Sequence, residues 1–123
     1  MGESMFNEIL QRIVGETGGG IGAVLMGYDG IAVEQYFQDE DPIDLQMIAV
    51  EYANVLKEIR NTAEMLNMGA MEEVSIRTEQ LITIIRLMTP EYFVAMALQR
   101  DGNFGKARYL LSRETPNLKD ALA

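Results

Sequence analysis

An Asp-Gly pair at positions 29 and 30 constrains the fold of this chain more than any other local feature. It separates two apolar runs of strand length, residues 21–28 and 31–37. Because such a pair suits the tight turn between antiparallel strands, it predicts a β-hairpin in which both turn residues have positive φ. The first run is apolar on both faces and the second alternates. The hairpin therefore predicts one central strand followed by one edge strand.

Three other segments have the three-and-four spacing of amphipathic helices. The first covers residues 5–14, with Ser4 as its N-cap. The second is long: it is expected to begin at Asp41-Pro42 and to end near Met68. Its expected core residues are Leu45, Ile48, Ala49, Tyr52, Val55 or Leu56, Ile59, Ala63 and Leu66.

The third helix is expected over residues 104–114, capped by Asn103. Pro116 follows it, and proline removes a backbone donor from a helix. Residues 115–123 are therefore predicted to form a weakly structured tail.

Three more strands are predicted at residues 73–78, 81–87 and 92–98, so the element order is α-β-β-α-β-β-β-α. Their short connections indicate a meander. The first, fourth and fifth strands are apolar on both faces and should be central. We therefore expect an α/β (α+β) domain spanning residues 1–123, with one mostly antiparallel five-stranded sheet of order 2-1-5-4-3. The first and third helices should cover one face and the second helix the other.

Composition excludes much chemistry. The chain has no histidine and no cysteine, which removes the commonest general base, thiolate chemistry and the imidazole metal ligands. We expect no enzymatic activity, no catalytic or metal-binding residue and no cofactor. The net charge of −9 disfavours nucleic acid and anionic membrane surfaces. No targeting segment or membrane-spanning apolar run is recognised, so a cytoplasmic location without membrane insertion is expected.

Two motifs are candidate ligand sites. Glycines cluster at residues 18–22, but a phosphate-binding loop needs a preceding strand, a following helix and a lysine, so a connector is favoured. The acidic residues 39–41 and Asp44 lack the spacing of a calcium loop. They are interpreted as a solvated loop with a helix cap.

The predicted edge strand at residues 73–78 and an additional apolar stripe on the second helix leave a monomer with uncovered surface. A two-fold dimer would cover both. The predicted dimer interface comprises Met47, Val50, Asn54, Val74, Ile76 and Arg77.

The chain resembles the Roadblock domain family, which is named for a dynein light chain, over residues 6–114. The resemblance is carried by residues 23–33 (AVLMGYDGIAV), the long second helix, residues 72–76 (EEVSI) and residues 103–108 (NFGKAR), in that order. It implies a profilin-like fold and a homodimer with one continuous sheet.

The resemblance also implies a non-catalytic adaptor or regulator of a Ras-like small GTPase, as in bacterial members of the MglB type. Once the core and dimer residues of the second helix are assigned, the polar residues expected to contact such a partner are Glu51, Lys57, Glu58 and Asn61. The alternative is a sensor or scaffold domain that binds a peptide or small ligand in another signalling system.

Overall fold

The computed structural model describes residues 4–38 and 43–123 of the chain. Within them it forms eight elements. These are α1 (Met5–Glu16), β1 (Gly20–Gly27), β2 (Ala32–Phe37), α2 (Leu45–Met65), β3 (Glu73–Arg77), β4 (Leu81–Leu87), β5 (Tyr92–Gln99) and α3 (Phe104–Leu122). The predicted order of elements is confirmed.

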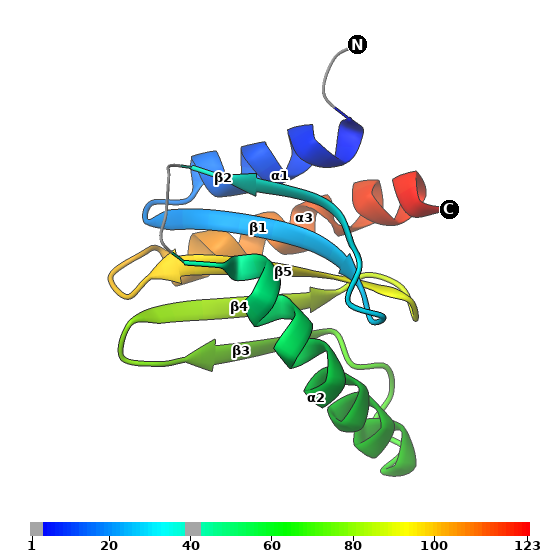
Figure 1. Cartoon of the computed structure of the whole chain (residues 1–123). Helices are drawn as coiled ribbons and strands as arrows, with labels where there is room; N and C mark the ends of the chain where they lie inside the picture. Colours follow the sequence, from blue (N-terminus) through cyan, green and yellow to red (C-terminus); the bar gives the residue numbers. More distant parts are fainter. Residues whose placement is uncertain (1–3, 39–42) are drawn as a thin grey trace.

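The five strands of the described chain form one sheet of order β2-β1-β5-β4-β3, and every neighbouring pair is antiparallel. Helices α1 and α3 cover one face and α2 crosses the other (Figure 1). Each face has its own core, because β1, β4 and β5 place buried side chains on both sides. The predicted fold class, strand order and distribution of helices are confirmed.

The hairpin between β1 and β2 is present, but its turn differs from the prediction. Gly30 has φ +87°, whereas Asp29 is not among the residues with positive φ. Instead, the Asp29 carboxylate accepts a hydrogen bond from the Ile31 N–H at 3.0 Å. Aspartate commonly stabilises turns through such a bond to its own backbone, and only glycine needs the left-handed conformation here.

Helix α2 begins later than predicted. Asp44 is its N-cap and accepts a hydrogen bond from the Met47 N–H at 3.0 Å. The helix therefore starts at Leu45 rather than Pro42, and the predicted cap at Asp41 lies outside the described residues. The helix ends at Met65, close to the expected position.

Helix α3 continues through Pro116 to Leu122, so the predicted tail at residues 115–123 is wrong. Leu118 is fully buried and Leu122 packs against the core formed with α1. Burial of these side chains offsets the backbone hydrogen bond that Pro116 cannot donate.

The glycine cluster forms a close contact between two loops. The Asn103 N–H donates to the Gly18 carbonyl, and the Gln99 N–H donates to the Gly19 carbonyl. A Cβ at Gly19 would lie 2.6 Å from the Gly102 Cα, and Gly19 has φ +82°. The predicted connector is therefore a tightly packed joint between the start of the sheet and the start of α3.

Candidate interaction surface

Strand β3 lies at one edge of the sheet, with no further strand of the described residues beside it. The Leu87 N–H donates to the Glu72 carbonyl, and the Thr78 N–H donates to the Leu81 carbonyl. In this pairing the backbone N–H and C=O groups of the even-numbered residues between positions 72 and 78 point toward β4. Because backbone groups alternate in direction along a strand, Glu73, Ser75 and Arg77 direct theirs toward the open edge. This edge can accept another strand.

The side chains of β3 differ between its two faces. Val74 and Ile76 lie on the α2 face and pack against its core. Glu73 and Arg77 lie on the α3 face, where Glu73 accepts a hydrogen bond from the Arg108 Nε at 2.7 Å. The Arg77 guanidinium lies 5.6 Å from the centre of the Phe104 ring. The edge thus has one apolar face and one face with an ordered carboxylate and an arginine.

The second half of α2 leaves apolar side chains uncovered. Val55, Ile59 and Leu66 are 48%, 40% and 63% exposed, although the sequence predicted the last two as core residues. Helix α2 crosses the sheet obliquely and its C-terminal half extends beyond β3 (Figure 1). Leu56 in this half is still buried against the sheet, but within residues 4–38 and 43–123 nothing covers the flank on which Val55, Ile59 and Leu66 lie.

The side chains of Val55, Ile59 and Leu66 lie on one flank of α2. The Val50 methyl groups lie beside Gly30 of the β1–β2 turn. At about 100° per residue, Val55, Ile59 and Leu66 lie about 140–180° around the helix from Val50. They therefore face away from that hairpin, toward the side of α2 where β3 forms the edge of the sheet.

The other predicted interface residues are accessible. Met47, Val50 and Asn54 are exposed. Of the four residues predicted to contact a partner, Glu51, Glu58 and Asn61 are exposed and Lys57 is half-buried. Glu51 and Glu58 lie on the side of α2 opposite the buried residues Leu45, Ala49, Ala53 and Leu56, whereas Lys57 and Asn61 lie on the Val50 flank. Their roles stay predictions.

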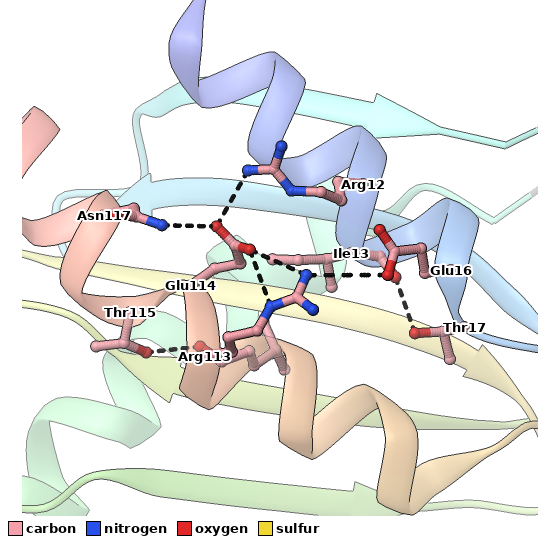
Figure 2. Close-up of polar contacts among 9 residues, drawn as sticks. Arg12, Ile13, Glu16, Thr17, Arg113, Glu114, Thr115 and Asn117 are labelled. Atoms are coloured by element: carbon pink, nitrogen blue, oxygen red, sulfur yellow. Dashed lines mark hydrogen bonds and ion pairs between the residues drawn. The ribbon is translucent and has the colours of Figure 1, made fainter.

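On the opposite face, a buried glutamate joins α1 to α3 (Figure 2). The Glu114 side chain is 5% exposed and accepts hydrogen bonds from Arg12, Arg113 and Asn117 at 3.0–3.2 Å. Arg113 also lies 3.9 Å from Glu16. This network sits across the molecule from the α2 surface and holds the two helices together.

Within residues 4–38 and 43–123, no group of three or more acidic side chains is placed to hold a metal ion. The candidate acidic loop at residues 39–41 lies outside this range. No described helix is both long and apolar enough to cross a membrane.

A five-stranded antiparallel sheet of this order, with two helices on one face and one on the other, defines a profilin-like domain of the Roadblock type. The sequence matches no family model and no curated protein. Solved structures do match it. The structure of MglC from Myxococcus xanthus is 41% identical, with 93% of this chain and 96% of that chain covered and a TM-score of 0.66.

Two further structures share the fold at lower identity. A Roadblock/LC7 domain from Streptomyces avermitilis is 14% identical, with a TM-score of 0.83 over 97% of this chain and 98% of that chain. The gliding protein MglB from Thermus thermophilus is 17% identical, with a TM-score of 0.81 over 92% of this chain and 84% of that chain. The chain belongs to the Roadblock domain family.

Sequence reasoning missed two features of these surfaces. It assigned Ile59 and Leu66 to the core, because helical periodicity does not show where a sheet ends. It also did not single out Glu114. Its position between the buried residues Leu111 and Leu118 on one helical stripe was the available signal.

Proposed function

We propose that this chain acts as a homodimeric, non-catalytic regulator of a Ras-like small GTPase in the cytoplasm. The observation that carries the proposal is the open edge of β3 next to the uncovered apolar flank of α2. A second copy would cover both surfaces with one two-fold axis. The family resemblance supplies the expected class of partner.

The residues of β3 favour one register for the dimer. If the two-fold axis passes through Ser75, Val74 lies opposite the partner's Ile76 and Arg77 lies opposite the partner's Glu73. Shifting the axis by one residue to Ile76 would set Glu73 opposite the partner's Glu79, which is a repulsive pair. The Ser75-centred register matches apolar with apolar and acid with base on each face of the sheet.

Helix α2 completes the proposed seam. Val55, Ile59 and Leu66 extend the apolar face of Val74 and Ile76 beyond the sheet. Burying them against the same residues of a second copy would remove apolar area from water. This proposal places the α2 contact in the second half of the helix, whereas the predicted contacts Met47, Val50 and Asn54 lie nearer its start and Val50 lies on the opposite flank, beside Gly30.

The proposed GTPase contact is the outward face of the paired α2 helices. Glu51 and Glu58 lie there, the exposed Asn61 and the half-buried Lys57 lie toward its margin, and all four are held on one helix. A mixed polar surface of this kind suits a specific and reversible contact. Regulation then requires only that the dimer bind the two nucleotide states of the GTPase unequally, since its switch loops already adopt two conformations.

Sedimentation equilibrium at micromolar concentration tests the seam. The wild-type chain should sediment at twice its mass of 13.8 kDa. Ile76→Asp should give a folded monomer, because it places an unpaired carboxylate in the apolar seam. Arg77→Glu should weaken the dimer, because it faces the partner's Glu73, whereas Lys106→Glu, an exposed position on α3, should not. A monomeric wild-type chain would refute the proposed dimer.

Titration of a small GTPase from the source cell, loaded with GDP or with a GTP analogue, tests the regulatory role. The dimer should bind one nucleotide state more tightly, and Lys57→Glu and Glu58→Lys should each reduce that binding. Equal affinity for both states would leave a tether rather than a regulator. If both reversals bind normally, the contact does not lie on α2.

A further inference from the structure

A pocket of about 450 Å³ opens at the end of the sheet where β4 turns into β5. The C-terminal halves of α2 and α3 reach this end from opposite faces (Figure 1). The pocket is lined from three layers, by Arg60 of α2, Arg86 of β4 and Lys119 of α3, together with the loop that precedes β3. Its volume is in the range of small-molecule sites, about 300–1,000 Å³.

The pocket gathers positive charge in an acidic protein. Three of the ten basic residues line it, in a chain whose net charge is −9. Two carboxylates, Glu64 and Glu72, also line it, so the lining retains an excess of one positive charge. An anion is therefore favoured over a cation at this place.

Arg86 has hydrogen-bonding capacity that the described residues do not use. Its side chain is only 18% exposed, and its Nε is buried without a hydrogen-bond partner in residues 4–38 and 43–123. Its terminal nitrogens lie 3.6 Å from Glu72 and 3.9 Å from Glu73. Charge-assisted hydrogen bonds are shorter, about 2.7–2.9 Å. A guanidinium has five donors, and burying them without acceptors costs free energy.

The neighbouring cation Arg60 is fixed by other contacts. Its Nη1 donates to the Pro90 carbonyl at 2.9 Å, and its guanidinium lies 4.7 Å from the centre of the Tyr28 ring. Arg60 thus holds α2 to the β4–β5 turn and forms a rigid wall of the pocket. The apolar wall is made by Met71, Leu87 and Met88.

We propose that this pocket binds a small organic oxyanion, a carboxylate or a phosphate ester. Its oxygens accept hydrogen bonds from Arg86, Lys119 supplies a second positive charge at the mouth, and the organic part packs against Met71 and Met88. The planar guanidinium suits such an oxyanion, because its donors match two oxygens at once. The site is built within one chain and is independent of the proposed GTPase contact.

Calorimetric titration of the 123-residue chain with inorganic phosphate, butyrate and hexanoate, at constant ionic strength, tests the site. At least one probe should bind saturably. Lys119→Gln should weaken that binding about tenfold, as expected for the loss of one charged contact. Lys106→Gln, which removes the same charge from the same helix outside the pocket, should leave it unchanged. Arg86→Met should abolish it, and its fold is checked by circular dichroism.

The probes separate the sources of the anion. Binding of phosphate alone assigns the site to phosphate esters, and tighter binding of hexanoate than of butyrate assigns it to carboxylates with an apolar chain. Two results would overturn the proposal. One is the absence of saturable binding for all three probes. The other is equal weakening by Lys119→Gln and Lys106→Gln, which would indicate only a general charge effect.

Discussion

Replacing Glu114 by glutamine would test how α1 and α3 are held together. Burial alone raises the pKa of this carboxyl, but hydrogen bonds from Asn117, Arg12 and Arg113 outweigh burial, so the pKa lies below its ordinary value. Glutamine preserves the shape and the possibility of accepting from Asn117, and it removes the charge that attracts the two arginines.

The expected loss of stability is moderate. Hydrogen bonds to charged groups contribute about 1.5–3 kcal/mol, whereas exposed ion pairs contribute about 0.2–1 kcal/mol. The Arg12 and Arg113 side chains are 44% and 39% exposed, so solvent screens them and the lower range applies to each. We expect Glu114→Gln to cost about 0.4–2 kcal/mol, which for a domain of this size lowers the melting temperature by about 1–8 °C.

Thermal unfolding at several pH values measures this contribution. Because the folded-state pKa of Glu114 is lowered, its stabilisation is fully present above the unfolded value of about 4.3 and is lost as the pH falls through the folded-state pKa. The gap between wild type and Glu114→Gln should therefore be constant near neutral pH and close in acid. Glu79→Gln, at an exposed turn, is the matched control.

A melting temperature for Glu114→Gln within about 1 °C of wild type at pH 7 would refute the reasoning. So would a gap that widens as the pH falls. The first result would mean that apolar packing, without the Glu114 charge, is enough to hold the two helices together, and the second would mean that the pKa of Glu114 is not lowered by folding.

Three other changes have clear expected outcomes. Gly19→Ala should destabilise the fold by at least about 2 kcal/mol in chemical denaturation, because its Cβ would meet the Gly102 backbone at a positive φ, whereas Gly18→Ala, with open space around it, should have a much smaller effect. Leu118→Ala should cost about 2–4 kcal/mol, a loss that a weakly structured tail would not produce. Adding a chelator should leave the melting temperature unchanged, and a fall of several degrees would direct attention to the acidic residues 39–41.

Much of the fold followed from local sequence patterns. Strand faces gave the order of the sheet, since a strand that is apolar on both sides must lie between two covered faces. The cap residues Ser4 and Asn103 marked the starts of α1 and α3, because each side chain accepts a hydrogen bond from an N–H three residues later. These features depend on a few neighbouring residues, so they can be read without knowledge of tertiary contacts.

The remaining features depended on what each segment packs against. Pro116 alone predicts the end of a helix, yet burial of Leu118 extends α3 beyond it. Periodicity placed Ile59 in a core, but it lies on the flank of α2 that the sheet does not cover, so the side chain is 40% exposed. In the sequence, Arg86 is a polar residue within a mostly apolar strand. It lines a pocket only because α2, α3 and the loop before β3 come together around it in the folded chain. Sequence determined the elements and their order, while the tertiary structure decided which of their faces are covered, because burial is set by residues distant in the chain.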